Sequence, residues 1–324
     1  MDVVDDPVLG RLLALRRHQQ DGKRSPHKPL LALLALGQLA ATGSSQLRWS
    51  AVEQRLGRLI ADYGPPSGTA QAQAAAYPFT RLRSDGVWTL SSNVPMDRVR
   101  PLTDLDVVGR LDPAIEARLV DPDVLYAVAR ALVEAEFPPT IASDVLVDVG
   151  LDPDQAAGPT AAATAAAVPG QRRRNGGWPG LVLTAWDRQC AFCGFDGQLG
   201  YGSVGIEAAH IWWFTYGGPD ALDNGLALCA LHHKLFDRGA LGLTRDHRIK
   251  VSGHFTARTP VGRQVYALAG QRLRPRPGTP LPAAEYLVWH DREVFKGSAG
   301  SAARPGRRGL PASPAASGEG RAGG

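Results

Sequence analysis

Hydrophobic and polar positions in the first 150 residues mostly follow helical spacing. Apolar residues recur every three or four positions over residues 8–20, and an almost wholly apolar stretch runs from Leu30 to Ala41. Ser50, with Glu53 three residues later, has the pattern of a capping box and predicts the start of another helix. We therefore expect a mostly helical N-terminal part.

Two short strands are predicted after these helices. Residues 77–82 and 87–90 flank the turn Ser84-Asp85-Gly86, which indicates a β-hairpin. Helices followed by a hairpin suggest a winged-helix-like arrangement. Two Asp-Pro pairs, at 112–113 and 121–122, then predict helix starts with an aspartate cap, and a short helix is expected over residues 141–149.

Composition divides the chain into four parts. Gly, Pro, Ala and Thr dominate a predicted linker, and Gly, Ala, Pro, Ser and Arg dominate the C-terminal end, which we expect to be disordered. The expected parts are a first domain at 1–151, a linker at 152–177, a second domain at 178–296 and a tail at 297–324. The fold class is α+β.

Charge is unevenly distributed along the chain. The net charge of +5 arises from +5 over residues 1–100, −9 over 101–160 and +9 over 161–324. Two basic regions suit a polyanionic partner such as nucleic acid, although ordinary surface charge gives the same count. The acidic N-terminus does not resemble a signal peptide, and the longest apolar run is too short to span a bilayer. We expect a soluble, cytoplasmic protein with no membrane partner.

All three cysteines lie in one short region, in two pairs of potential metal ligands. Cys190 and Cys193 form the first pair, and Cys229 and His232 form the second. An odd cysteine count argues against a disulfide framework, whereas four such ligands suit one tetrahedral zinc ion. Many zinc folds share this spacing, so a purely structural zinc site is an alternative reading.

Three further residues near the zinc ligands suit metal-assisted phosphodiester hydrolysis. His210 can deprotonate water near neutral pH, and His233 points about 100° away from His232 on a helix, where it can bind a second, catalytic ion. Asn224 lies in the turn Asp223-Asn224-Gly225, where its amide can fix the loop that carries His210. These residues predict a nuclease.

The order of these residues resembles the HNH endonuclease family, over residues 186–240 and including Leu235–Gly239. The resemblance implies a zinc-stapled ββα-metal fold, with His210 as general base, Asn224 as the structural asparagine and His233 as ligand of a catalytic Mg²⁺ or Mn²⁺. Two positions depart from the pattern. His232 replaces a frequent fourth cysteine, and Ala209 replaces a frequent aspartate ligand, for which Glu207 is the nearest carboxylate.

The layout of the whole chain is similar to phosphorothioate-dependent restriction endonucleases of the McrA type. The matching stretches are His27–Leu31, Tyr77–Phe79 with Asp85–Trp88, and Phe137–Thr140 through Asp148–Leu151. This resemblance implies that the first domain binds double-stranded DNA in which sulfur replaces a non-bridging phosphate oxygen. Tyr77 and Pro78 are then candidates for an apolar sulfur pocket, and His27, Lys28 and Arg81 for contacts with the flanking DNA.

The sequence thus predicts a type IV restriction endonuclease that binds phosphorothioated DNA and cuts it with an HNH site. Two alternatives stay open. The same nuclease could be directed by methylated cytosine or by sequence, or the chain could be a zinc-stabilised DNA-binding protein without catalysis. Double-strand cutting by one nuclease site suits a homodimer, but no interface can be identified from the sequence.

Overall fold

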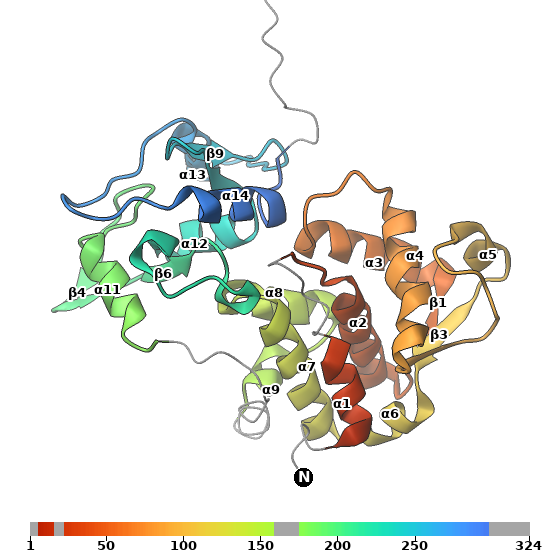
Figure 1. Ribbon diagram of the computed structural model, residues 1–324. Coiled ribbons are helices and arrows are strands. Elements are labelled where there is room, and N and C mark those ends of the chain that lie inside the picture. The colour runs from red at the N-terminus through yellow and green to blue at the C-terminus, as the bar shows by residue number, and fades with distance from the viewer. Residues whose placement is uncertain (1–5, 16–22, 159–174, 298–324) are drawn as a thin grey trace, which may run out of the picture.

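The computed structural model describes residues 6–15, 23–158 and 175–297, which gather in two lobes (Figure 1). We call residues 6–158 the N-terminal lobe and residues 175–297 the C-terminal lobe. Most buried apolar side chains of each lobe form a hydrophobic cluster of their own. Within the described ranges, no helix is both long and apolar enough to cross a membrane.

The N-terminal lobe is mostly helical and holds one small antiparallel sheet of order β1-β3-β2. Its strands are β1 (Leu47–Arg48), β2 (Trp88–Leu90) and β3 (Val108–Leu111). Its helices are α1 (Pro7–Leu13), α2 (His27–Thr42), α3 (Trp49–Tyr63), α4 (Gln71–Arg81), the 3₁₀ helix η2 (Leu82–Asp85), α5 (Val99–Asp104), α6 (Pro113–Arg118), α7 (Pro122–Glu136), α8 (Pro139–Val149) and α9 (Pro153–Ala157).

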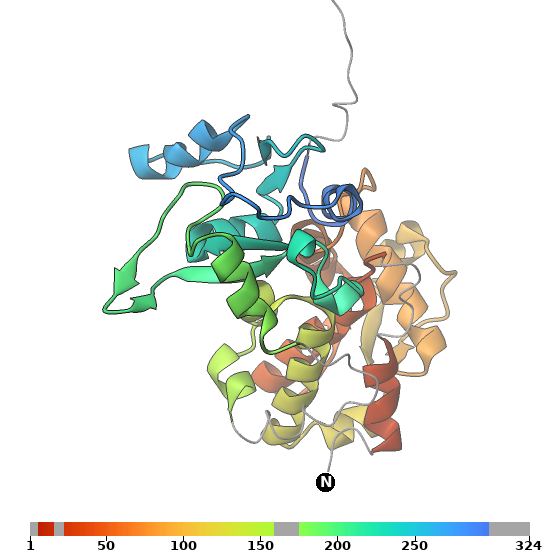
Figure 2. The ribbon, with the colours of Figure 1, turned by 60° about the vertical axis from the view of Figure 1, so that its left-hand side comes forward.

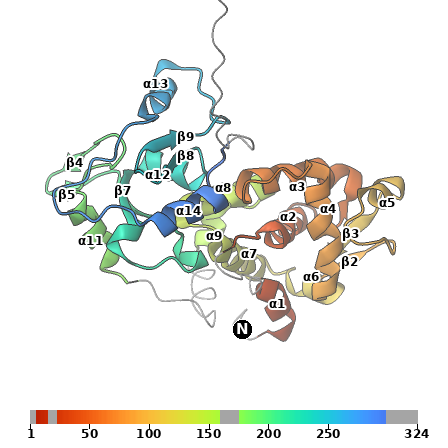
Figure 3. The same cartoon turned by 45° about the horizontal axis from the view of Figure 1, so that its top comes forward.

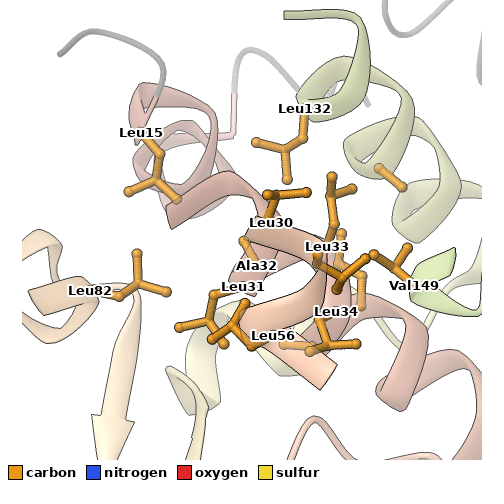
Figure 4. Packing of buried hydrophobic residues seen from close by; sticks show 14 of the residues in the cluster. Leu15, Leu30, Leu31, Ala32, Leu33, Leu34, Leu56, Leu82, Leu132 and Val149 are labelled. Atoms are coloured by element: carbon orange, nitrogen blue, oxygen red, sulfur yellow. The ribbon is translucent and has the colours of Figure 1, made fainter. Parts of the chain in front are cut away.

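Helix α2 forms the centre of this lobe because it is apolar on all sides. Every residue from Pro29 to Gly37 is buried, which is the pattern of a helix enclosed by others. Figure 4 shows its leucines pointing toward Leu56 of α3, Leu132 of α7 and Val149 of α8. Gly37 permits the close crossing of α8, since a Cβ there would lie 1.9 Å from the Val149 carbonyl oxygen.

Two local predictions for this lobe are wrong. Residues 77–81 are helical rather than extended, because the alanine-rich stretch before Tyr77 favours a helix that continues through Pro78. The strand β2 consequently pairs with β3 and not with residues 77–82. Helix α3 begins at Trp49, one residue before the predicted cap, and the Ser50 amide donates to the distant carboxylate of Asp106 at 3.0 Å.

The C-terminal lobe contains a ββα unit, as the resemblance to the HNH endonuclease family implied. It consists of β6 (Ile206–His210), β7 (Gly225–Cys229) and α12 (Ala230–Asp237). The remaining elements are α11 (Trp178–Ala185), β4 (Gln198–Leu199), β5 (Gly202–Ser203), η3 (Phe214–Tyr216), η4 (Leu222–Asn224), β8 (Leu241–Leu243), β9 (Ile249–Val251), α13 (Pro260–Arg263), η5 (Gln264–Leu268) and α14 (Ala284–Glu293). The hairpin β4–β5 projects away from the rest of the lobe (Figure 2).

The two lobes pack against each other. Helix α8 contacts α12, and Figure 3 shows α8 between α7 and the C-terminal lobe. Trp213, Tyr216 and Trp289 of the C-terminal lobe belong to the hydrophobic cluster of the N-terminal lobe. That cluster also includes Ala156 of α9, so it extends into the range predicted as linker; residues 159–174 of that range, and residues 298–324 of the predicted tail, lie outside the described residues.

Candidate active site and metal centre

The antiparallel pair β6–β7 sets the positions of the candidate residues. His210 at the end of β6 is opposite Gly225 at the start of β7, and Ile206 is opposite Cys229. Helix α12 follows β7 directly, so His232 and His233 lie in its first turn. Gly225 lets the strand pass close to α11, since a Cβ there would lie 2.6 Å from Val182 Cγ2 and 3.0 Å from the Trp178 ring.

His210 is held on two sides. Its Nε2 lies 2.8 Å from Oδ1 of Asp220, and its ring stacks on Trp178 with centroids 3.7 Å apart and planes 15° apart. The other oxygen of Asp220 accepts from the Asn175 amide at 2.8 Å. The carboxylate therefore favours the tautomer of His210 that carries its proton on Nε2, which makes Nδ1 the basic nitrogen.

Asn224 is fully buried and ties together the loop between the two strands. Its Oδ1 accepts from the Trp212 amide at 2.8 Å, and its Nδ2 donates to the carbonyls of Trp212 and Pro219 at 3.0 and 2.9 Å. The Ile211 amide also donates to the Asn224 carbonyl at 3.0 Å. This asparagine thus fixes the chain immediately after His210, so it acts on the geometry of the site rather than on its chemistry.

Cys190, Cys193, Cys229 and His232 form a group whose ligand atoms all lie within 4.8 Å of one another. His232 Nδ1 is 3.4 Å from Cys190 Sγ and 3.2 Å from Cys229 Sγ. In a tetrahedral zinc site with bonds of about 2.0–2.3 Å, neighbouring ligand atoms lie roughly 3.3–3.8 Å apart. Hydrogen bonds from Cys229 and His232 lower the pKa of the Cys190 thiol, so Cys190 is the thiol of this coupled group that loses its proton first. The group can hold a metal ion.

A second group of potential ligands surrounds His233. Its Nδ1 lies 2.7 Å from Glu207 Oε2, and its Nε2 lies 3.3 Å from Asp237 Oδ2. Burial alone would lower the pKa of His233, but the carboxylates of Asp237 and Glu207 outweigh it and raise the pKa to about 9. A divalent cation would have to displace the Nδ1 proton before Glu207 and His233 could bind it as carboxylate and imidazole ligands.

His210 and the group around His233 both line one cavity of about 390 Å³. Glu207, His210, His233 and Asp237 line one part of it. Pro138, Pro139 and Thr140, at the start of α8 in the N-terminal lobe, line another. His210 and the Glu207–His233 pair thus face the same space, which is large enough for a phosphodiester group.

The candidate residues of the N-terminal lobe lie on α2 and α4. Tyr77 is half-buried beside the buried Pro78, and the Arg81 guanidinium lies 5.1 Å from the Tyr77 ring centroid. Arg81 also binds Asp97 through two hydrogen bonds of 2.8 and 2.5 Å. The structure therefore brings Tyr77, Pro78 and Arg81 together.

The α2 candidates have different surroundings. Lys28 pairs with Asp85 at 2.5 Å, which joins the start of α2 to the end of η2. His27 lies near Gly64, and burial together with the charge of Arg24 lowers its pKa to about 4. His27 is therefore neutral at physiological pH, so it would contact DNA by a hydrogen bond and not by charge.

Sequence reasoning missed three side chains that shape the site. Asp220 orients His210, Trp178 stacks on it, and Asp237 holds His233. Asp237 stands four residues after His233, a helical spacing that brings both to one face of α12, so the sequence does contain a signal for it. Asp220 has no comparable signal, because the fold of the loop between β6 and β7 brings it to His210.

Two family models match segments of the chain, one in each lobe. Residues 5–154 match the family model described as a ScoMcrA-like DNA sulfur-binding domain, and residues 190–244 match that of an HNH endonuclease. The search of curated proteins found no match.

Solved structures that resemble the chain include the type IV phosphorothioation-dependent restriction endonuclease ScoMcrA, at 21% identity and a TM-score of 0.35 over 45% of this chain and 29% of that one. Another is the sulfur-binding domain of SprMcrA complexed with phosphorothioated DNA, at 22% identity and a TM-score of 0.37 over 46% of this chain and 97% of that one. The chain spans less than a third of the ScoMcrA structure. The two matched segments therefore follow the order of a ScoMcrA-like DNA sulfur-binding domain and an HNH endonuclease domain.

Proposed function

We propose that this protein is a type IV restriction endonuclease that binds phosphorothioated DNA and hydrolyses phosphodiester bonds near the modification. The observation that carries the proposal is the convergence of His210, Glu207 and His233 on one cavity, in a chain whose other lobe matches a sulfur-binding family. Its substrate would be modified double-stranded DNA that enters the cell, and its location would be the cytoplasm.

His210 acts as the general base in the proposed reaction. Asp220 holds its Nε2–H, so Nδ1 accepts a proton from the attacking water. The water oxygen forms a bond to phosphorus, and the bond from phosphorus to the leaving oxygen breaks. Trp178 restricts the tilt of the imidazole ring, and Asn224 keeps the following loop in place. Asp220, Trp178 and Asn224 therefore contribute by positioning His210, and only His210 takes up a proton.

Glu207 and His233 would hold a divalent cation, Mg²⁺ or Mn²⁺. The Glu207 carboxylate and the His233 imidazole lie next to each other on the cavity wall, and such ions keep several waters and need few protein ligands. When bound, the cation supplies positive charge that stabilises the phosphate and the leaving oxygen. Glu207 takes the place of the carboxylate that Ala209 lacks. Zn²⁺ bound by the Cys₃His group would link the start of α12 to the Cys190–Cys193 loop.

Tyr77 and Pro78 are the proposed contacts for sulfur. Sulfur is larger and less strongly hydrated than phosphate oxygen, so an apolar surface favours it. The half-buried Tyr77 ring beside Pro78 provides such a surface, and Arg81 beside it provides positive charge for the backbone. Lys28 and His27 would contact the flanking DNA.

The C-terminal lobe offers further phosphate contacts. Six arginines between residues 245 and 276 are exposed, and no described carboxylate lies within 4.0 Å of their guanidinium nitrogens; they are Arg245, Arg258, Arg263, Arg272, Arg274 and Arg276. Unpaired arginines can neutralise phosphates without reading sequence. A homodimer would place one nuclease site on each DNA strand.

Binding of three matched duplexes tests the sulfur specificity. The duplexes are unmodified, methylated at cytosine, and phosphorothioated in the Rp configuration. Full-length protein with His210→Ala would be used, so that cleavage does not disturb the gel shift. We expect the sulfur duplex to bind at least about tenfold more tightly than the others, which is about 1.4 kcal/mol.

Two variants sharpen this test. Tyr77→Ala should reduce the preference for sulfur, while the same change at the fully exposed Tyr201 of the C-terminal lobe should leave it intact. Equal affinity for all three duplexes would contradict sulfur recognition. Tighter binding of the methylated duplex would instead favour a methylation-directed nuclease.

A further inference from the structure

The N-terminal lobe forms part of the wall of the nuclease cavity. Pro138, Pro139 and Thr140 line the cavity together with the candidate metal-binding and catalytic side chains of the C-terminal lobe. Thr140 lies in the first turn of α8, a helix of the sulfur-binding domain. The nuclease site is therefore not enclosed by the HNH domain alone.

Thr140 makes a specific polar contact inside this cavity. Its hydroxyl donates a hydrogen bond to Oδ2 of Asp237, the same oxygen that lies 3.3 Å from His233 Nε2. The other oxygen of Asp237 accepts from the Trp213 indole at 3.0 Å. Asp237 is only 3% exposed, so protein donors rather than water determine where its carboxylate lies.

The contact continues from Asp237 to the candidate metal ligands. Asp237 holds one ring nitrogen of His233, and the other ring nitrogen lies 2.7 Å from Glu207. Carboxylates that bind the second nitrogen of a metal-binding histidine fix its tautomer and ring orientation. A hydroxyl that donates to such a carboxylate helps to fix the orientation of the same histidine ring, one hydrogen bond further from the ion.

We propose that Thr140 is a positioning residue of the nuclease site, contributed by the sulfur-binding domain, and that it acts through Asp237 on His233. The ion-binding pair of the HNH domain is then fully oriented only while the Thr140 hydroxyl contacts Asp237. This inference rests on the proposed function for the identity of the reaction, but the contact and its effect on ion binding do not depend on the DNA target.

Other contacts between the lobes keep α8 in this place. Lys234 of α12 pairs with Asp144 of α8 at 2.8 Å. The buried Arg24 donates to the carbonyls of Tyr63 and Glu293 at 2.5 and 2.7 Å, and its guanidinium lies 4.1 Å from the Trp213 ring centroid. A buried guanidinium that satisfies groups of both lobes is costly to separate, because each partner would lose its charged donor. The docking is therefore specific, and Thr140 is held against Asp237.

Mn²⁺ binding by the full-length, zinc-loaded protein tests the inference without DNA. The loss of the free Mn²⁺ signal in electron paramagnetic resonance gives the affinity for Mn²⁺. The binding that is lost in His233→Ala is assigned to the Glu207–His233 site. We expect Thr140→Val to weaken Mn²⁺ binding about tenfold, the lower end for groups that orient a metal-binding histidine. Thr140→Ser keeps the hydroxyl and should restore most of the affinity.

Asp144→Asn is the matched control, since it removes the neighbouring contact between α8 and α12 and leaves Asp237 untouched. This ion pair is partly exposed, so its loss should leave α8 docked, and the variant should bind Mn²⁺ as the wild type does. Cleavage of the phosphorothioated duplex should follow the Mn²⁺ affinities across the series. If the wild type binds Mn²⁺ but does not cut the phosphorothioated duplex, the proposed function is wrong. The Mn²⁺ affinities of the variants still test the role of Thr140 in that case.

Three results would overturn the role of Thr140. The first is an unchanged Mn²⁺ affinity in Thr140→Val. The second is an equal loss in Asp144→Asn, which would show that any loosening of the lobes has the same effect. The third is faster cleavage by Thr140→Val, which would mean that the start of α8 obstructs the cavity instead of organising it.

Discussion

Replacing Asp220 by asparagine should slow cleavage without abolishing it. The bond from Asp220 to His210 Nε2 is 2.8 Å long, and the two side chains are only 14% and 13% exposed, so water screens it little. A hydrogen bond to a charged group contributes about 1.5–3 kcal/mol. A loss of about 2 kcal/mol in the orientation of the general base corresponds to a rate lower by roughly thirtyfold.

The assay is single-turnover cleavage of a phosphorothioated duplex at saturating enzyme and divalent cation. The Asp220→Asn rate should fall while the DNA affinity stays the same. Loss of the carboxylate also makes protonation of the imidazole less favourable, so the acid limb of the pH–rate profile should move to lower pH. A purely structural role would not move that limb.

Asp223→Asn is the control for this experiment. Asp223 lies in the same loop, and its side chain has no hydrogen bond to His210 among the described residues. It should cleave at the wild-type rate. If Asp220→Asn also cleaves at the wild-type rate with an unchanged pH profile, His210 does not use Asp220, and the assignment of Nδ1 as the basic nitrogen is wrong.

Three other changes test the remaining parts of the site. Asn224→Ala removes three buried hydrogen bonds and should lower the free energy of unfolding by about 3 kcal/mol in urea titrations; a loss below about 1 kcal/mol would contradict its role in fixing the loop. Elemental analysis should find one zinc ion per wild-type chain and none in Cys229→Ser, which should also lose cleavage; retained zinc in the variant would show that the Cys₃His group is not its site. His290 stacks on Phe236, and burial lowers its pKa to about 4. As the pH falls, His290 is therefore protonated in the unfolded chain before it is protonated in the folded one. Between pH 6.5 and 5, the free energy of unfolding of the wild type should fall by about 2 kcal/mol more than that of His290→Gln. An equal dependence of the two free energies on pH would contradict this.

The sequence predicts those parts of the site that depend on local spacing. Cys190 and Cys193, like Cys229 and His232, are close in the chain, so each pair can reach one ion wherever the rest of the fold lies. The order of His210, Asn224 and His233 resembles the HNH endonuclease family, and that resemblance implied the ββα unit whose register the structure defines.

Residues brought together by tertiary packing could not be predicted in the same way. Thr140 follows two prolines and reads only as part of a helix start, and its contact with Asp237 exists because α8 docks on the other lobe. Tyr77 and Phe79 alternate with other residues as in a strand, but the preceding alanines and the apolar contacts of Phe79 with Trp49 and Trp88 favour a helix. The identity of the bound DNA depends on such packed surfaces, so it requires measurement.

The most direct test of the account compares cleavage of two duplexes that differ by one atom. Full-length protein with Mg²⁺ or Mn²⁺ would be given an Rp-phosphorothioated duplex and its unmodified counterpart. We predict that the wild type cuts the sulfur duplex at least about tenfold faster, and that His210→Ala cuts neither. Equal cleavage of both duplexes by the wild type would contradict guidance by sulfur, and undiminished cleavage by His210→Ala would contradict the HNH mechanism.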